Sequence, residues 1–201
     1  MKADTLEKSP PLHRFTCGEY DAMAEMGLFA DERVELINGE IVQMSPQSEL
    51  HSSRITRLTT LFGRVFFKGF LIRTQVPLHI APRSEPEPDF AIVDDQPLAD
   101  DTLRPTTARL VVEISNTRIN YDREVKGSLY AKAAIPEYWL INLKDECVEV
   151  FRNPIKAKGR TFGWGYSTCQ TLSRGEWISP LCVPTEKIAV KDLLPYVSVD
   201  S

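Results

Sequence analysis

Three charged residues of this chain are candidates for a functional site, and two of them are carboxylates. Glu113 interrupts the apolar run LVVEI at 110–114, which is typical of a strand covered on both faces. A buried carboxylate is costly unless a cation pairs with it, either a neighbouring side chain or a metal ion. Asp89 opens the upstream strand candidate DFAIV directly after Pro88. Because hard divalent cations bind carboxylate oxygens, Glu113 is a candidate metal ligand, whereas an acid at a strand start, as at Asp89, is a weak signal by itself.

Lys126 is the third of these residues. On a helix predicted over 122–134, it lies in the middle of the apolar stripe that also carries Leu129 and Ala133, at about 100° per residue. The alternative is a surface pair with Asp122 one turn earlier, which would contribute only about 0.3–0.5 kcal/mol. The stripe favours the first interpretation, in which the helix delivers a positive charge toward the sheet.

Two further polar residues have ordinary explanations beside the functional one. His51 lies on the apolar side of a second predicted helix, near its N-terminus, where a histidine is either a hydrogen-bonded core residue or part of a site. Glu35 belongs to a predicted hairpin, where it would point to solvent in the normal alternation of a strand. Neither residue identifies a site by itself.

The elements that must position these residues follow from periodicity and turn signals. Thr16 and Glu19 have the spacing of a helix-capping box, and Asn38-Gly39 between two β-forming runs predicts a two-residue hairpin. The other expected elements, in order, are helices at 17–26 and 48–69, strands at 70–80, 89–93 and 110–114, the helix at 122–134, strands at 137–143 and 147–151, and a helical turn at 189–194 among added hairpins. Helices separate groups of strands without strict alternation, so a mixed α/β sheet is expected.

Basic side chains gather on the predicted long helix. Six basic residues and no acidic one lie between Leu50 and Ser84. Four of them share an arc of about 80° at about 100° per residue: Arg54, Arg57, Arg64 and Lys68. They form either a solvated edge of the helix or a stripe that follows nucleic-acid phosphates, because clustered like charges are stabilised by a polyanion.

Length and composition limit the classes of protein. The 201 residues fit one domain, expected over 14–201 after a flexible tail at 1–13. The net charge of −4, from 24 basic and 28 acidic residues, excludes a histone-like protein and a polybasic membrane binder. No stretch approaches 18 apolar residues and the N-terminus lacks an apolar signal segment, which predicts a cytoplasmic protein without membrane contact. A homodimer is left open.

The four cysteines form no C-x-x-C pair, and none lies at zinc-ligand spacing from a histidine. We therefore expect small buried hydrophobic residues in a reducing compartment at Cys17, Cys147, Cys169 and Cys182.

These residues and motifs resemble a known family. Pro88-Asp89, then Glu113 in an apolar strand, then a helical lysine resemble the PD-(D/E)xK nuclease superfamily. Over residues 15–195 the chain is similar to the Uma2 family of restriction-endonuclease-like proteins, on His51 and the segments ELINGEIVQMSP, EPDFAIV, LVVEIS and YDREVKGSLYAKAAIPEYWLI. The resemblance implies a restriction-endonuclease-like mixed β-sheet core flanked by helices, with an N-terminal helix and hairpin and added C-terminal strands.

The resemblance also implies a site. Asp89 and Glu113 would hold Mg²⁺ or Mn²⁺, and Lys126 would assist catalysis. Glu35 would act in the same pocket. Ser115 stands where the superfamily often places its lysine, so Lys126 would replace that lysine from the following helix. Around the pocket we expect His51, Ser115, Asp122 and Tyr130.

The leading hypothesis is a metal-dependent endonuclease that hydrolyses DNA, with RNA as the second nucleic acid considered. One alternative is a non-catalytic nuclease-like module that binds nucleic acid or a protein. The intact set of Asp89, Glu113 and Lys126 favours the enzyme, because a non-catalytic module gains nothing from a buried carboxylate and lysine. A glycosidase with two carboxylates is a third class, but it explains neither the lysine nor the basic helix.

Overall fold

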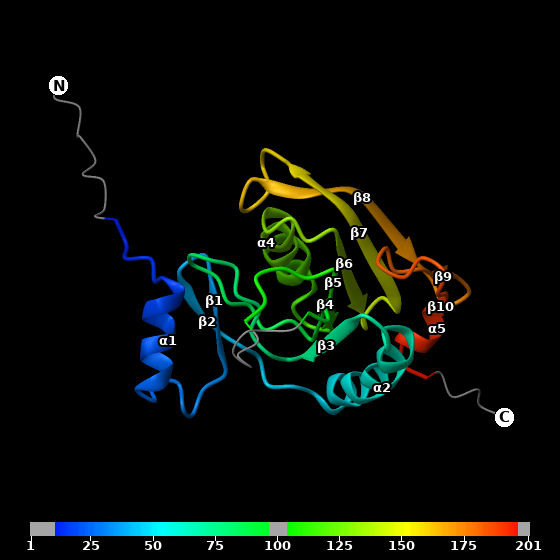
Figure 1. The fold of residues 1–201 in the computed structure, drawn as a ribbon, viewed down its shortest axis with the longest axis horizontal. Coiled ribbons are helices and arrows are strands. Elements are labelled where there is room, and N and C mark those ends of the chain that lie inside the picture. Colours follow the sequence, from blue (N-terminus) through cyan, green and yellow to red (C-terminus); the bar gives the residue numbers. More distant parts are fainter. Residues whose placement is uncertain (1–10, 97–103, 197–201) are drawn as a thin grey trace, which may run out of the picture.

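A six-stranded sheet forms the centre of the protein in a computed structural model, which describes residues 11–96 and 104–196 (Figure 1). Its strands are β3 (Phe70–Thr74), β4 (Phe90–Asp94), β5 (Leu110–Ser115), β6 (Glu137–Asn142), β7 (Cys147–Lys156) and β8 (Trp164–Leu172). They lie in the order β3-β4-β5-β6-β7-β8, with β5 and β6 parallel and the other neighbours antiparallel. The predicted mixed α/β sheet is confirmed.

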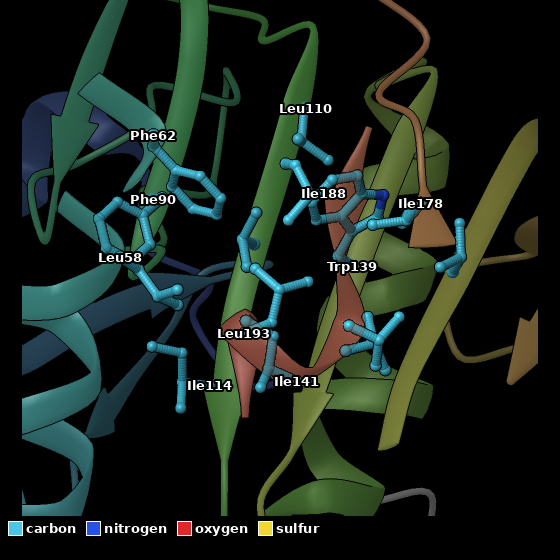
Figure 2. Close-up of a cluster of buried hydrophobic side chains, with 14 of the residues drawn as sticks. Leu58, Phe62, Phe90, Leu110, Ile114, Trp139, Ile141, Ile178, Ile188 and Leu193 are labelled. Atoms are coloured by element: carbon cyan, nitrogen blue, oxygen red, sulfur yellow. The ribbon is translucent and has the colours of Figure 1, made fainter. Parts of the chain in front are cut away.

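Helix α2 (Glu49–Val65) covers one face of this sheet with its apolar stripe. The ring of Phe62 lies 5.0 Å from that of Phe90 on β4 and 6.4 Å from that of Trp139 on β6, measured between centroids. Figure 2 shows these rings packed together with Leu58. Burial of large apolar side chains contributes about 1.5–3 kcal/mol for each of them, so this cluster anchors α2 on the sheet.

The C-terminal segment closes the same face. It consists of β9 (Trp177–Ile178), β10 (Ile188–Ala189) and α5 (Val190–Leu193). Ile178, Ile188 and Leu193 join the cluster under α2. The expected helical turn at 189–194 and the added C-terminal strands are therefore present.

The connection between the parallel strands β5 and β6 covers the opposite face, so that α2 and this connection lie on different sides of the sheet (Figure 1). It consists, in order, of α3 (Ile119–Tyr121), the π-helical turn η1 (Asp122–Lys126) and α4 (Gly127–Lys132). The regular helix predicted over 122–134 is therefore wrong in its detail. The Gly127 N–H donates to the Asp122 carbonyl five residues earlier, and the Tyr138 hydroxyl donates to the same carbonyl at 3.1 Å.

Helix α1 (Cys17–Glu25) and the hairpin of β1 (Val34–Ile37) and β2 (Glu40–Gln43) form a smaller unit beside the main sheet (Figure 1). The capping box is confirmed, because the Glu19 N–H donates to Thr16 Oγ1 at 3.2 Å and the Thr16 N–H donates to Glu19 Oε2 at 2.8 Å.

The predicted Asn38-Gly39 turn is also confirmed. The two residues have φ angles of 50° and 81°, which is the left-handed region that a two-residue hairpin requires. A Cβ atom at Gly39 would lie 2.8 Å from the Cβ of Arg14, so glycine is needed here for space as well as for conformation.

Two expectations need correction or qualification. The strand predicted over 70–80 ends at Thr74, because Gln75 takes a left-handed backbone conformation with φ of 52°. Most of the predicted N-terminal tail, residues 1–10, lies outside the described residues. None of the helices within 11–96 and 104–196 has the length and apolar character needed to cross a membrane.

Candidate active site

Asp89 and Glu113 are brought together by the antiparallel pairing of β4 and β5. Phe90 lies opposite Val112 in this pair, so the same register places Asp89 opposite Glu113. The Ile114 N–H donates to Asp89 Oδ2 at 2.8 Å, which holds the Asp89 carboxylate against β5. Both acids are buried. By strand alternation both side chains point to the face covered by the α3–η1–α4 connection.

Lys126 enters this site from η1. Its Nζ lies 3.0 Å from Glu113 Oε1 and 3.2 Å from Glu35 Oε2, and the Tyr130 hydroxyl donates to Glu113 Oε1 at 2.6 Å. Strand β1 supplies Glu35, so the hairpin beside the main sheet contributes to the site. The structure thus brings Glu35, Glu113 and Lys126 into direct contact although three separate segments supply them.

The site holds more negative than positive charge. Four carboxylates are buried around one buried ammonium, that of Lys126: Glu35, Asp89, Glu113 and Asp122. Loss of solvation raises the pKa of Glu113 to about 8, because Lys126 offsets only part of that loss. Burial also raises the pKa of Asp122, and Lys126 again acts in the opposite direction.

Burial and the neighbouring carboxylates act in opposite directions on the pKa of Lys126. Burial by itself lowers it, but the carboxylates of Glu113, Glu35 and Asp122 raise it well above the usual range of a lysine. The ammonium is therefore charged at neutral pH. Even with Glu113 protonated, one ammonium does not balance the other three carboxylates, and a hard divalent cation held by Asp89 and Glu113 fits this excess of negative charge.

The hydrogen bonds leave room for such an ion. Lys126 and Tyr130 both donate to Oε1 of Glu113, so among the described residues Oε2 of Glu113 accepts no hydrogen bond. On the other acid, His51 Nε2 lies 3.0 Å from Asp89 Oδ2 and Gln75 Nε2 donates to Oδ1 at 3.1 Å. These donors fix the orientation of the Asp89 carboxylate, as partners outside the coordination shell do in metal sites.

A pocket of about 190 Å³ opens onto these groups. Within the described part of the chain, three buried polar atoms beside it have no hydrogen-bond partner: His51 Nδ1, Ser115 Oγ and the Tyr121 hydroxyl. Buried polar atoms are normally satisfied, so all three are available to a ligand or to water in the pocket. At the rim lie two guanidinium groups, those of Arg33 and Arg118.

Comparison with known proteins identifies the family. The Uma2 family profile, described as "Putative restriction endonuclease", matches residues 17–191. The chain belongs to the Uma2 family. Among solved structures, the fold of this Uma2 protein is similar to that of a "putative nuclease belonging to DUF820" from Anabaena variabilis ATCC 29413, with a TM-score of 0.63 and 16% identity over 81% of this chain and 90% of that chain. No curated protein matches the sequence.

Three of the four other predicted pocket residues of the Uma2 protein line the pocket, and the fourth, Tyr130, lies behind Glu113. Ser115 and Asp122 line the pocket with Glu113. Tyr130 is fully buried on α4 and reaches the site only through its hydroxyl group on Glu113. His51 lines the pocket at the start of α2.

Arg54 does not belong to an exposed basic stripe, and this prediction is wrong. Its side chain is buried, and Nη1 donates to the Leu194 carbonyl at 2.7 Å because the C-terminal segment packs over this part of α2. Arg57, Arg64 and Lys68 are exposed. Arg57 lies over the ring of Tyr196, 4.9 Å from its centroid.

Sequence reasoning missed four residues of the pocket: Arg33, Gln75, Arg118 and Tyr121. Gln75 reaches Asp89 only because β3 ends in a left-handed residue, and no sequence signal marks that turn. Tyr121 and Arg118 do have a signal, since they follow β5, and ligands in α/β folds bind beyond the carboxyl ends of parallel strands.

Proposed function

We propose that this Uma2 protein is a metal-dependent endonuclease that hydrolyses phosphodiester bonds of DNA. The observation that carries the proposal is the contact of Lys126 with Glu113 beside Asp89, in a buried site that opens onto a pocket. In the proposal, Asp89 and Glu113 hold Mg²⁺ or Mn²⁺. The description of the family supports a nuclease, and the charge excess supports a divalent ion.

When bound, the ion polarises the scissile phosphate and lowers the pKa of the attacking water. The chain's own residues have distinct parts in the proposal. Lys126 keeps its positive charge in the dry site, where it stabilises the negative charge that develops on the phosphate. Tyr130 fixes the Glu113 carboxylate through its Oε1 atom.

The rim arginines are suited to the phosphates that flank the scissile bond. Arg118 Nη1 donates to the Gln43 carbonyl at 3.2 Å, and the guanidinium lies 5.7 Å from the centroid of the Tyr121 ring. Arg33 pairs with Glu87 at 3.0 Å. Guanidinium groups bind phosphates with paired hydrogen bonds, so we assign Arg33 and Arg118 to substrate binding.

Incubation with supercoiled plasmid tests this proposal. Nicked and linear DNA is expected with Mg²⁺ or Mn²⁺ and none with EDTA, and the Asp89→Asn variant controls for contaminating nucleases. Single-stranded RNA and oligosaccharides serve as parallel substrates. Binding of DNA without cleavage would replace the proposal by a non-catalytic module, and cleavage of oligosaccharides alone would replace it by a glycosidase.

The exposed basic residues of α2 and its end predict a salt effect. Alanine at Arg57, Arg64 and Lys68 is expected to weaken DNA binding across all sequences and to flatten the slope of log affinity against log salt by up to about 2.7, at about 0.9 per phosphate contact. Fluorescence anisotropy at several salt concentrations measures this slope. An unchanged slope would show that these side chains are only solvated. The matched control is the exposed basic set on the other side of the molecule, Lys156, Lys158 and Arg160.

A further inference from the structure

A second group of metal-binding side chains lies outside the active site, where α1 meets the segment that leads to β4. Cys17, His79 and Glu85 each offer one ligand atom, and the sulfur, nitrogen and oxygen atoms lie within 4.8 Å of one another. His79 Nδ1 is in hydrogen-bond contact with Glu85 Oε1. These three residues are not among those that line the active-site pocket. The group is therefore separate from the site of the proposed function.

The backbone holds these three residues firmly in place. Ile80 and Ser84 form an antiparallel bridge with hydrogen bonds of 2.8 and 3.1 Å, so His79 and Glu85 face each other on its two arms. The Cys17 N–H donates to the Pro82 carbonyl at 2.9 Å, which fixes the start of α1 against the same loop.

Glu85 is also fixed from the side of the hairpin. It exchanges two backbone hydrogen bonds with Leu36 on β1, of 2.7 and 3.3 Å. The ligand atoms thus come from α1 and from both arms of one loop, and β1 supports that loop from behind. A site assembled from fixed backbone needs only small side-chain movements to close around an ion.

The combination of cysteine, histidine and glutamate also has the composition of a nucleophilic triad, but the surroundings argue against it. Cys17 is 3% exposed, and its Sγ donates to the Ser84 carbonyl at 3.6 Å. Burial raises the pKa of the Cys17 thiol, whereas a nucleophilic cysteine needs a lowered one and room for a substrate. A single ion needs no such room. The side chain of His79, 26% exposed, leaves one side open to solvent.

We propose that Cys17, His79 and Glu85 bind one Zn²⁺ ion, with a water molecule as the fourth ligand. Thiolate sulfur, imidazole nitrogen and carboxylate oxygen are the ligands of zinc, at about 2.3 Å for sulfur and about 2.0–2.2 Å for the others. Tetrahedral bonds of these lengths separate the ligand atoms by about 3.4–3.6 Å, which is within the 4.8 Å that encloses the three atoms. On binding, His79 Nδ1 and Glu85 Oε1 move apart as the ion replaces the hydrogen bond between them.

The charges balance in this site. The Zn²⁺–S bond replaces the S–H bond of Cys17, and the proton passes to solvent. Thiolate, carboxylate and Zn²⁺ then sum to zero. The neighbouring carboxylate of Asp21 is already paired with Arg104, at 2.6 Å. A bound ion would tie α1 to the loop that ends at Asp89, and so support the active site from outside.

Cobalt titration tests the ligand set, because Co²⁺ bound to a thiolate absorbs light by charge transfer. The full chain is titrated with Co²⁺ in saturating Mg²⁺, which occupies the proposed catalytic site. We expect one equivalent of Co²⁺ with this absorption, none in Cys17→Ser, and an unchanged titration in the control Cys169→Ser on the exposed face of β8. Absence of the absorption, or its survival in Cys17→Ser, would overturn the proposal.

Thermal unfolding gives a second and independent readout. In saturating Mg²⁺, Zn²⁺ at about 100 times its dissociation constant is expected to raise the unfolding temperature by about 5–10 °C. His79→Asn changes a partly exposed side chain and should lose this shift without loss of fold, since removal of even an outer-shell partner weakens metal affinity about 10–100-fold. An equal shift in His79→Asn would contradict the site. The same measurement in Glu113→Gln should give the wild-type shift, which separates this site from the catalytic one.

Discussion

Replacing Glu113 with glutamine is expected to lower Mg²⁺-dependent cleavage of plasmid DNA by about 10³-fold or more, while the protein keeps its fold. Glutamine removes the charge that would hold the ion. The fold survives because burial raises the pKa of Glu113 in the metal-free protein, so that glutamine, a neutral group of similar shape, replaces a carboxylate whose charge the dry site disfavours. Initial cleavage rates and thermal unfolding followed by circular dichroism measure the two effects.

The same variant tests whether the pKa of Glu113 is raised in the folded protein. The folded protein holds a proton on Glu113 that the unfolded chain releases above about pH 4.5, so the free energy of unfolding in EDTA should fall as pH rises from about 4.5 to about 8. Glu113→Gln cannot titrate, and this fall should be smaller in it. Mg²⁺ should also reduce the fall in the wild-type protein, because it stabilises the charged carboxylate.

Glu124→Gln is the matched control, because Glu124 lies on the same π-helical turn but is exposed and pairs with Arg160. Its cleavage rate should equal that of the wild type. A Glu113→Gln protein that cleaves within tenfold of the wild-type rate would remove Glu113 from the catalytic machinery.

Lys126→Met is expected to abolish cleavage and, in addition, to lower the free energy of unfolding by about 3–5 kcal/mol. From the sequence alone, methionine keeps the stem and removes only the charge, which predicts a stable fold. The structure changes this expectation, because Lys126 is the cation between Glu113 and Glu35, and its loss leaves buried carboxylates without a partner. Urea unfolding measures the loss, and part of it should return in Mg²⁺ if the ion binds these acids.

Lys132→Met provides the comparison, since Lys132 lies at the end of α4, six residues after Lys126, and is exposed. It should change neither cleavage nor stability by more than about 0.5 kcal/mol. Cleavage by Lys126→Met at the wild-type rate would contradict the assignment of Lys126 as the catalytic lysine.

Local features of the fold could be predicted because their causes lie within a few residues. The capping box of α1 needs only Thr16 and Glu19, and the hairpin turn needs only Asn38 and Gly39. The end of β3 has no comparable cause in the sequence. Gln75 adopts its left-handed conformation while its N–H bonds to carbonyls of the segment before β4, a contact between distant residues.

The candidate site could be predicted where a charge interrupts an apolar pattern. Glu113 inside LVVEI and Lys126 inside a helical stripe are both anomalies of this kind, and the structure places them 3.0 Å apart. Arg54 shows the limit of the same reasoning. Helical periodicity places Arg54 beside the apolar face but does not show whether its side chain is buried. The C-terminal segment that covers it, around Leu194, lies 140 residues further along the chain.

The π-helical turn between Asp122 and Lys126 has a consequence for insertions and deletions in this family. A bond that spans five residues encloses one residue more than the bond of an α-helix, so the connection from β5 to β6 is one residue longer than a regular helix of the same span. Residues before and after the turn are therefore out of helical phase. This lets η1 direct Lys126 at the acids while α4 packs the ring of Tyr130 against that of Tyr138 on β6. A homologue that lacks one residue here would have to give up one of these two contacts, even if it retained every catalytic side chain.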